Sequence, residues 1–501
     1  MADYLQLLSA FAVVLLALYY YFTSTFDFWK IRGVPGPRPL PILGNNMQLL
    51  RQKKQFGVMC KDLYDKYKSE PMVGMFLWST PGLILRDLDL IKDVLIKDFS
   101  IFSCRGITIN GNTTPSSLNL FALEARRWRP LRARLSPVFT TGKLKEMFPL
   151  IIECAEHLEK HLGQAVEKEG PVDCREIAAK FTTDVIGSCA FGIEMNALSN
   201  EESEFRRMGR KIFENNYIMY LRGILKEVTP QLFNLLSYIL PQLEALTFFT
   251  KVVNDTIDYR KKNNIVRPDF INMLIDLKDH PEKLEGIETT DALLTAQALI
   301  FFAAGFETSS TTISHALYEM ALNPEMQDKL RAEIRECSAK TNGDFNYDTL
   351  KNMEYLDKIF KETLRKYPSG TSIRRKPTTS YTFNGTKVTI TKDTIVTVPI
   401  YAIHRDPSLY PDPDVFNPER FDKEAEAARH PMSYLPFGDG PRNCIGARFA
   451  IFQTKIGLIN MLQNFRFDVC EKTLIPYIHE PVSQILCPKG GIYLKVSKVK
   501  N

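Results

Sequence analysis

A long apolar run lies at the beginning of the chain. Residues 4–22 are apolar except for two uncharged polar side chains. In a helix that rises about 1.5 Å per residue, this run spans roughly 30 Å, the hydrocarbon thickness of a bilayer. Asp3 is the only charge before the run, whereas Lys30 and Arg32 follow it. This asymmetry favours an uncleaved anchor over a signal peptide and predicts that the rest of the chain lies in the cytosol.

A proline-rich segment follows the predicted anchor. Residues 33–41 contain four prolines, which fix the backbone φ angle and remove hydrogen-bond donors. The segment predicts a stiff spacer, although an ordinary proline-rich linker has the same composition. We therefore expect an anchor over residues 1–25, a linker over 26–45 and one large body over 46–501. Four aromatic residues suit the cytosolic interface of a membrane: Tyr19, Tyr20, Tyr21 and Trp29.

Helix-period patterns dominate the body, and the clearest helix is predicted from Thr290 to Leu322. This stretch contains no proline and is about three times as long as an average helix. Asn323 and Pro324 end it, since proline is favoured in the first turn of a following helix. Its middle, residues 299–306, is apolar all round, which predicts burial on every side.

Strand signals are few. Residues 379–383 and 387–390 flank Asn384-Gly385, which is a strong hairpin turn, and a further strand is predicted over 394–399. Residues 405–421 are rich in proline and have little periodicity, so we expect a long ordered coil there. The fold class is mainly α with a small β region in a single large domain.

Composition narrows the functional classes. Hydrophobic residues make up 45% of the chain and charged residues 24%, as in ordinary globular proteins. The net charge of +6 is small for 501 residues and gives no indication of nucleic-acid binding. The nine cysteines include no C-x-x-C pair, which argues against a disulfide framework or zinc ribbon and favours a reducing compartment. Most of them should pack as small buried hydrophobes.

One cysteine differs from the others in its neighbours. The segment from Phe437 to Gly446, FGDGPRNCIG, fits the pattern F-x-x-G-x-R-x-C-x-G around Cys444. Its glycines allow a tight turn beneath a flat macrocycle, Arg442 can pair with a haem propionate, and the backbone can donate hydrogen bonds to the sulfur. A thiolate ligand donates electron density to haem iron and favours O–O cleavage. Without this loop, Cys444 would be interpreted as a structural thiol.

The loop resembles the haem-ligand loop of the cytochrome P450 superfamily. The similarity extends over essentially the whole chain and is strongest to insect microsomal members of the detoxification type. The resemblance implies the cytochrome P450 fold, a single large helical domain that encloses haem b and carries an N-terminal anchor in the endoplasmic reticulum membrane. It further implies that Cys444 is the metal ligand, that Phe437 also contacts the cofactor, and that O2 is a co-substrate.

The segment from Ala304 to Ser309, AGFETS, lies within the predicted long helix and resembles the oxygen-activating motif of the family. The resemblance implies that Ala304 lies against the haem, that Gly305 leaves room for dioxygen, and that Glu307 and Thr308 are catalytic and deliver protons. The plain alternative is a threonine bonded back to the carbonyl four residues earlier, with Glu307 in a structural ion pair.

Two further groups of residues follow from the resemblance. Arginine suits bidentate binding of carboxylates, and the resemblance implies that the haem propionates bind Trp128, Arg132, Arg375, Arg442 and, as a weaker candidate, Arg105, which could equally be a solvated charge. It also implies a buried structural triad that retains haem, formed by Glu362, Arg365 and Arg420. Without that context, Glu362 and Arg365 would be an ordinary exposed helical pair.

The substrate pocket is implied by the same resemblance and is mostly apolar, which predicts a lipophilic substrate. Its expected residues are Phe121, Ile300, Ala303, Ile373 and Leu486, with Ala304 and Thr308 beside them. Residues 369–372, SGTS, replace a bulkier apolar stretch of close relatives, so we expect a more polar or roomier wall there. Residues 233–243 could either dip into the membrane or form a buried helix.

The resemblance implies insertion of one oxygen atom from O2 into lipophilic small molecules, with xenobiotics, plant toxins or insecticides as substrates. The alternatives are a hydroxylase of an endogenous hormone or fatty acid, and a haem-thiolate isomerase or haem-binding sensor.

No dinucleotide or flavin motif is visible, so electrons are expected from NADPH–cytochrome P450 reductase, with cytochrome b5 as a second donor. Basic residues near Trp128 and Cys444 could attract an acidic donor or form a solvated helix face: Arg126, Arg127, Arg129, Arg134, Lys143, Lys145, Arg448 and Lys455.

Overall fold

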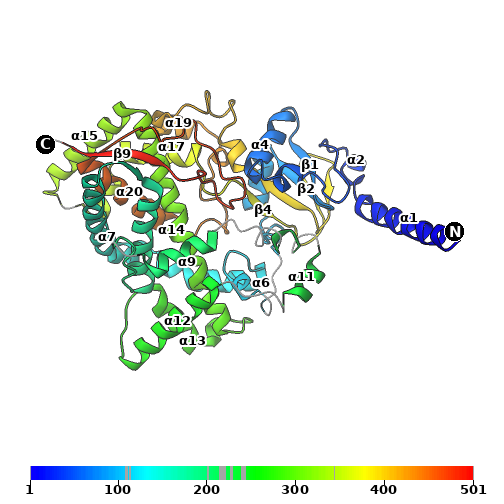
Figure 1. Cartoon of the computed structure of the whole chain (residues 1–501), viewed down its shortest axis with the longest axis horizontal. Helices are drawn as coiled ribbons and strands as arrows, with labels where there is room; N and C mark the ends of the chain where they lie inside the picture. The colour runs from blue at the N-terminus through cyan, green and yellow to red at the C-terminus, as the bar shows by residue number, and fades with distance from the viewer. Residues whose placement is uncertain are drawn as a thin grey trace.

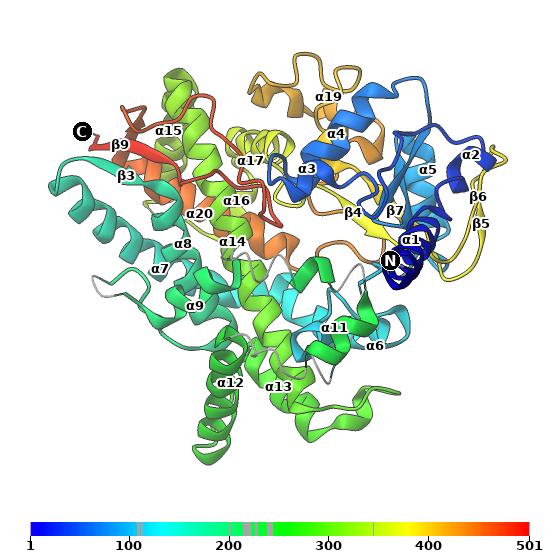
Figure 2. The same cartoon turned by 45° about the vertical axis from the view of Figure 1, so that its right-hand side comes forward.

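The computed structural model describes residues 2–107, 111, 114–199, 202–213, 222–225, 229–237, 244–343 and 345–499. Its longest helix, α14 (Asp291–Leu322), runs through the middle of the body (Figures 1 and 2). The Thr290 hydroxyl caps this helix by accepting a hydrogen bond of 3.1 Å from the Leu293 amide. Pro324 opens the next helix, α15 (Pro324–Lys340). The predicted start and end of the long helix are therefore confirmed.

The prediction that the middle of α14 is buried on every side is wrong. Phe302 and Phe306 are fully buried, but Ala304 is exposed and both Ile300 and Thr308 are partly exposed. Residues four apart lie on one face of a helix, so these three side chains form a single uncovered stripe. Most of the rest of the helix is buried, so we infer that the stripe borders a hollow inside the body.

Helices make up most of the body. Those that surround α14 or complete the body are α4 (Phe56–Lys66), α5 (Leu88–Lys92), α6 (Ala125–Leu135), α7 (Thr141–Glu167), α8 (Cys174–Ile186), α9 (Glu204–Phe213), α11 (Pro230–Leu236), α12 (Glu244–Lys262), α13 (Phe270–Asp279), α16 (Tyr347–Lys351), α17 (Glu354–Lys366), α18 (Ile400–Ile403), α19 (Lys423–Ala427) and α20 (Ala447–Asn464). Two one-turn helices, α2 (Phe28–Ile31) and α3 (Met47–Leu50), precede them.

Three small sheets complete the described fold. The largest has the order β1-β2-β7-β4, and β2 and β7 form its parallel pair. The second has the order β3-β9-β8, and the third is the hairpin β5-β6. The strands are β1 (Met72–Leu77), β2 (Thr80–Leu85), β3 (Pro171–Asp173), β4 (Ile373–Arg375), β5 (Tyr381–Thr382), β6 (Thr389–Ile390), β7 (Ile395–Val398), β8 (Phe465–Asp468) and β9 (Tyr493–Lys498).

The predicted hairpin and its neighbour are confirmed, although the strands are shorter than expected. Tyr381 pairs with Ile390, and Gly385 in the turn has a φ of +72°, which glycine adopts without strain. The sequence did not indicate β1 and β2. The β1 strand is buried at every position, so it lacks the polar–apolar alternation that marks a half-buried strand.

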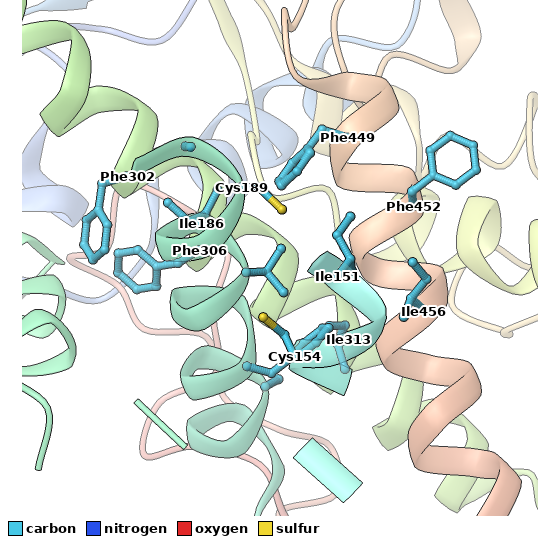
Figure 3. Close-up of a cluster of buried hydrophobic side chains, with 14 of the residues drawn as sticks. Ile151, Cys154, Ile186, Cys189, Phe302, Phe306, Ile313, Phe449, Phe452 and Ile456 are labelled. Atoms are coloured by element: carbon cyan, nitrogen blue, oxygen red, sulfur yellow. The ribbon is translucent and has the colours of Figure 1, made fainter. Parts of the chain in front are cut away.

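The main core forms where four helices meet. Figure 3 shows Ile186 of α8 beside Phe302 and Phe306 of α14. It also shows Ile151 and Cys154 of α7 close to Ile313 of α14, with α20 packed alongside. Five cysteines other than Cys444 are buried and all nine are free thiols. These five buried thiols confirm the prediction that most of the cysteines pack as small hydrophobic side chains.

The predicted anchor forms the helix α1 (Ala2–Thr23), which extends away from the body at one end of the molecule (Figure 1). Two described helices are long and apolar enough to cross a membrane, α1 from Asp3 onward and α14. The best window of α14 is 67% buried inside the body, whereas none of the window in α1 is buried. Helix α14 is therefore a core helix, and α1 is the candidate anchor.

The segment after α1 packs against the first sheet instead of crossing solvent. The Pro35 carbonyl accepts a hydrogen bond of 2.8 Å from the Gly74 amide in β1. Trp29 is only 4% exposed, and its indole N–H donates to the Met75 carbonyl at 2.8 Å. The expectation that Trp29 lies in an aromatic membrane belt is therefore wrong, because the indole fills a space beside β1.

Candidate active site

The Cys444 loop is a tight turn held from several sides. Gly438 and Gly440 have φ values of +69° and +74°, and a Cβ atom on Gly440 would overlap the Leu95 carbonyl. The Cys444 amide donates to the Phe437 carbonyl at 2.9 Å, and Phe437 itself is partly exposed. Helix α20 begins at Ala447, directly after the turn. The glycines and the helix start thus fix the position of the sulfur.

Cys444 is the only exposed cysteine of the nine, yet burial raises the pKa of its thiol. Both observations hold if the surrounding protein encloses the loop and leaves Cys444 uncovered only on the side that faces a hollow inside the fold. The Gly446 amide and the charges of Arg132 and Arg105 act in the opposite direction and lower this pKa. The loop thus offers hydrogen bonding and positive charge to a thiolate, the form that binds metals.

Helix α6 carries two of the predicted cofactor residues to the same loop. The Arg132 guanidinium donates to the Asn443 carbonyl and to its side-chain oxygen, both at 3.0 Å. Trp128 is buried, and the Arg442 guanidinium carbon lies 4.5 Å from the centre of its ring. The structure therefore brings Trp128, Arg132 and Arg442 together around the cysteine turn.

Arg105, Arg375 and Arg442 form a group of cations that has no anionic partner among the described residues. Burial lowers the pKa of Arg375 and of Arg442 to about 10, and burial together with the charges of both neighbours lowers the pKa of Arg105 well below its usual value. The buried Nε of each has no hydrogen-bond partner. Within the described ranges, none of the three forms an ion pair. Such a group is costly unless an anion joins it, and the two propionates of haem fit this requirement.

The predicted oxygen-activating residues lie on two faces of α14. The Thr308 hydroxyl donates to the Ala304 carbonyl at 2.7 Å, on the uncovered stripe. Glu307 is only 4% exposed and forms an ion pair with Arg175 of α8. Arg175 was not expected from the sequence, which carries no signal for a pair of residues 132 positions apart. Both contacts match the plain alternative, and both are compatible with proton transfer.

Gly305 points away from the uncovered stripe. A Cβ atom at this position would collide with the Ile186 side chain of α8. The expectation that Gly305 makes room for dioxygen is therefore not supported. The glycine instead allows α14 and α8 to pack closely.

The predicted structural triad is assembled in the interior. Arg365 donates to both carboxylate oxygens of Glu362, at 2.7 and 2.8 Å, and both side chains are completely buried. The Arg420 Nε lies 3.6 Å from the same carboxylate. Arg365 also donates to the His404 carbonyl at 2.8 Å, and the Asn417 amide donates to Glu362 at 2.9 Å. The triad thus ties α17 to the long coil after α18.

Comparison with known proteins agrees with this geometry. The family profile described as Cytochrome P450 matches residues 34–496. Cytochrome P450 6A1 of Musca domestica is 41% identical over 99% of this chain and 98% of its own length. Cytochrome P450 6k1 of Blattella germanica is 38% identical over 97% of this chain and 96% of its own. The chain belongs to the cytochrome P450 family. It is a P450 monooxygenase, and its similarity to insect detoxification-type members is confirmed.

The predicted substrate residues of this cytochrome P450 are not all in one environment. Phe121 is 49% exposed and Ile300 is partly exposed, so both can line a cavity. Ala303 and Ile373 are buried, at 5% and 7% exposure. Leu486 is completely buried and packs with Tyr367 and Tyr401. The assignment of Leu486 to the cavity wall is therefore wrong for this structure, because its side chain lies behind the wall.

One expectation about the surface of this P450 also changes. Lys455 is only 3% exposed and pairs with Asp357 at 2.7 Å, so it cannot belong to a cationic docking face.

The expectation of a more polar wall at residues 369–372 changes for one residue. Thr371 is buried, and its hydroxyl accepts a hydrogen bond from Gln55. The Thr371 hydroxyl therefore does not make the wall more polar. In the segment 233–243, Phe233 is buried and Leu235 is exposed, while residues 238–243 lie outside the described residues.

Proposed function

We propose that this cytochrome P450 inserts one oxygen atom from O2 into lipophilic small molecules, with xenobiotics, plant toxins and insecticides as expected substrates. The observation that carries the proposal is the exposure of Cys444 in its glycine turn, while most of the other cysteines are buried. Two further observations support it: three arginines have no anionic partner in the part of the chain that the structure describes, and one stripe of α14 is uncovered.

Haem b fits the residues that line this hollow. The Cys444 thiolate would bind the haem iron, and Arg105, Arg375 and Arg442 would bind the propionates, with Trp128 and Arg132 beside them. When bound, haem supplies the oxygen chemistry, which a thiolate ligand promotes by donating electron density to the iron. The chain itself then has to bind substrate, move protons and receive electrons.

Thr308 and Glu307 are the proposed proton-transfer residues. Thr308 faces the hollow, and its hydroxyl oxygen keeps a lone pair while its proton is donated to the Ala304 carbonyl. A cavity of about 480 Å³ reaches Glu307 and Arg175 from the side of α9. Exposed residues such as Glu202 and Arg207 line the same cavity. Solvent protons can therefore approach Glu307, and Thr308 can pass them on.

The uncovered apolar side chains of Phe121, Ile300 and Ala304 would bind and orient the substrate. Burial of apolar surface contributes a favourable free energy of about 25 cal/mol per Å², so the affinity for a substrate should increase with its apolar surface area. No carboxylate or ammonium group is among these three side chains. The expected substrates are therefore lipophilic and uncharged at the end that is oxidised.

Electrons would reach this site from NADPH–cytochrome P450 reductase, with cytochrome b5 as a second donor. Arg126, Arg129 and Arg448 are exposed on α6 and at the start of α20, next to the Cys444 loop, and they could attract an acidic partner. Arg127 is less available because it pairs with Glu124 at 2.6 Å. We further propose that α1 spans the endoplasmic reticulum membrane once and leaves the body in the cytosol.

The experiment combines the full-length protein with haem, the reductase and lipid, and measures NADPH consumption, peroxide and oxygenated product for a panel of lipophilic compounds. We expect substrate-dependent NADPH consumption with product. Thr308→Ala should divert electrons into peroxide, since the proton-transfer hydroxyl is lost. Thr312→Ala is the matched control, because Thr312 is one turn further along α14 and bonds back to the Thr308 carbonyl.

Two outcomes would contradict the proposal. One is product formation that needs neither NADPH nor O2, which would indicate an isomerase. The other is equal peroxide from wild type and Thr308→Ala during product formation, which would remove Thr308 from proton transfer.

A further inference from the structure

The loop that carries Phe121 is attached to α14 through one buried side chain, and the proposed function does not use this attachment. The loop follows a 3₁₀ helix, η2 (Pro115–Leu118), and ends before α6. Gln297 of α14 is completely buried and contacts this loop. A buried polar side chain is costly unless it is hydrogen-bonded, so the partners of Gln297 show what it stabilises.

Both ends of the Gln297 amide group bind backbone atoms. Its side-chain oxygen accepts a hydrogen bond of 2.8 Å from the Leu120 amide. Its side-chain nitrogen donates to the Leu118 carbonyl and to the Leu293 carbonyl, both at 2.8 Å. The Leu293 carbonyl is one turn earlier in α14, so this bond fixes the side chain on its own helix. The other two bonds hold a loop that is distant in sequence.

The position of the loop depends on these bonds. The Leu120 amide is buried, and the Leu120 side chain belongs to the main core. Without Gln297 this N–H group would be left unpaired in the interior, at a cost in free energy. The loop would then move until another acceptor or water reached the amide.

The attachment lies at one end of the uncovered stripe of α14. Residues three and four apart share a helix face, so Gln297, Ile300 and Ala304 follow one another along the same face. Gln297 is completely buried, whereas Ile300 is partly exposed and Ala304 is exposed. The loop therefore covers this face at Gln297 and leaves it uncovered from Ile300 onward.

Phe121 is the residue next to this attachment. Its side chain is 49% exposed, although its neighbours Leu120 and Ala122 are each only 6% exposed. One peptide bond joins Phe121 to Leu120, so a movement of the Leu120 backbone carries Phe121 with it. The bonds of Gln297 thus determine where Phe121 stands relative to the stripe.

Arginines of the proposed haem site hold Phe121 from another side. Arg442 donates to the Phe121 carbonyl at 3.4 Å and also to the Leu123 carbonyl. The Arg105 guanidinium carbon lies 4.0 Å from the centre of the Phe121 ring, which is a cation–π contact. Gln297 is therefore the attachment of this loop that can be changed without altering the proposed propionate ligands.

We infer that Gln297 is a positioning residue for the substrate: it fixes the backbone of residues 118–120 on α14 and thereby sets the place of Phe121 in the substrate wall. The inference rests on the proposed function, which makes Phe121 a substrate contact. Because Gln297 is completely buried, it acts on the substrate only through Phe121. Large apolar ligands that reach the wall should depend on Gln297, whereas small ligands that bind only at the iron should not.

The test compares Gln297→Met with wild type in the haem-loaded, full-length protein. Methionine has nearly the length of glutamine, so it removes the hydrogen bonds with little change in volume. The first measurement is hydrogen–deuterium exchange of residues 117–123, which include the Leu120 amide. We expect faster exchange in Gln297→Met, because this amide has lost its acceptor.

The second measurement is the dissociation constant of two iron-binding probes, imidazole and clotrimazole, from the shift of the Soret band. Imidazole is small, whereas clotrimazole carries three aromatic rings beside its imidazole group. Gln297→Met should weaken the binding of clotrimazole relative to imidazole about tenfold, and Phe121→Ala should do the same. The double variant should bind clotrimazole no more weakly than Phe121→Ala alone, because both residues act through one contact.

Gln327→Met is the matched control. Gln327 of α15 is also buried, at 1% exposure, and it likewise holds distant backbone, through the Phe467 carbonyl at 2.8 Å and the Phe467 amide at 3.0 Å. It should lower stability in urea as Gln297→Met does, but leave the exchange of residues 117–123 and the ratio of the two dissociation constants unchanged. An equal change of the ratio in Gln327→Met would indicate a general effect of stability and overturn the inference.

Three other results would also overturn the inference: unchanged exchange in Gln297→Met, an unchanged ratio in spite of faster exchange, or an unchanged ratio in Phe121→Ala. The last result decides the matter even if Gln297→Met does not fold, because the exposed Phe121 side chain can be removed without loss of the core. A wild type whose Soret band does not shift with imidazole would contradict the proposed haem site instead, and the exchange measurement would still test the attachment.

Discussion

Buried charges are balanced in two ways in this protein. Glu362 and Arg365 neutralise each other through two hydrogen bonds in a completely buried pair. Arg105, Arg375 and Arg442 have no such partner among the described residues. The first arrangement stabilises the chain by itself, whereas the second is balanced only when an anionic group joins it.

Arg365→Ala should strongly destabilise the fold and release haem. The substitution leaves the Glu362 carboxylate buried without its main partner, which costs about 3–5 kcal/mol. The measurement is urea unfolding followed by far-UV circular dichroism, together with haem content. The control is Lys340→Ala, which breaks a fully exposed pair with Glu336 and should leave the free energy of unfolding nearly unchanged, because solvent screens such pairs. Equal effects of the two substitutions would contradict the structural assignment of Arg365.

His404 should make the protein less stable in mild acid. Burial and the charges of Arg365 and Arg405 lower its pKa to about 3, and its neutral Nε2 accepts a hydrogen bond of 2.8 Å from the Leu435 amide. An unfolded histidine has a pKa near 6.5, so below that pH the unfolded chain binds a proton that the folded chain does not. Stability is therefore lost as pH falls from about 6.5 towards 3.

The measurement is the free energy of unfolding at pH 7 and pH 5 for wild type and His404→Gln. Glutamine can accept the Leu435 hydrogen bond but does not titrate, so the variant should lose less stability between the two pH values. Burial also lowers the pKa of His479, to about 4, so part of the slope should persist. An unchanged slope in His404→Gln would contradict the assignment.

At the scale of elements, the packing of α14 on α8 depends on Gly305. Gly305→Ala should destabilise the protein by about 1–3 kcal/mol, because the new methyl group collides with Ile186. Adding Ile186→Ala should make the double variant more stable than the sum of the single effects predicts, as expected for contacting residues. Thermal unfolding of the four proteins measures this coupling. If the effects of Gly305→Ala and Ile186→Ala on stability simply add in the double variant, the new methyl group does not collide with Ile186.

Elements with local signals could be predicted from the sequence, and those defined by distant partners could not. The bounds of α14 follow from Thr290 and Pro324, which act within one turn of the helix. The β1 strand gives no such signal because side chains from distant parts of the chain bury both of its faces, with Trp29 in the cluster on one face and Met59 of α4 in the cluster on the other. The exposed stripe of α14 was missed because an apolar sequence does not tell whether its neighbours are protein atoms or a cofactor.

The same distinction holds for the site. The Cys444 loop is contiguous, so its pattern is complete in the sequence. The partner of Glu307 lies 132 residues away on another helix, and nothing local marks Arg175. Lys455 was placed on the surface by its distance along the chain from Cys444, but it faces Asp357 on the buried side of α20.

At the scale of the whole molecule, α1 and the body are separate in packing. The candidate span is not buried against any part of the body, and contacts with the first sheet begin at Thr25, whose hydroxyl donates to the Ser79 carbonyl. Deletion of residues 2–22 should therefore leave the thermal midpoint of the body unchanged. It should also move the protein from the membrane fraction to the soluble fraction after alkaline carbonate extraction. A lower midpoint would show that α1 stabilises the body, and continued membrane retention would show that another surface is the main anchor.

The most direct test of haem binding through Cys444 is the absorption spectrum of the reduced protein with carbon monoxide. A thiolate ligand gives the strongly red-shifted Soret band of this complex, so wild type should show it. Cys444→His offers a neutral nitrogen ligand at the same position and should bind haem without the shift. A wild-type band at the unshifted position, or a red-shifted band that persists in Cys444→His, would contradict the assignment of Cys444 as the iron ligand.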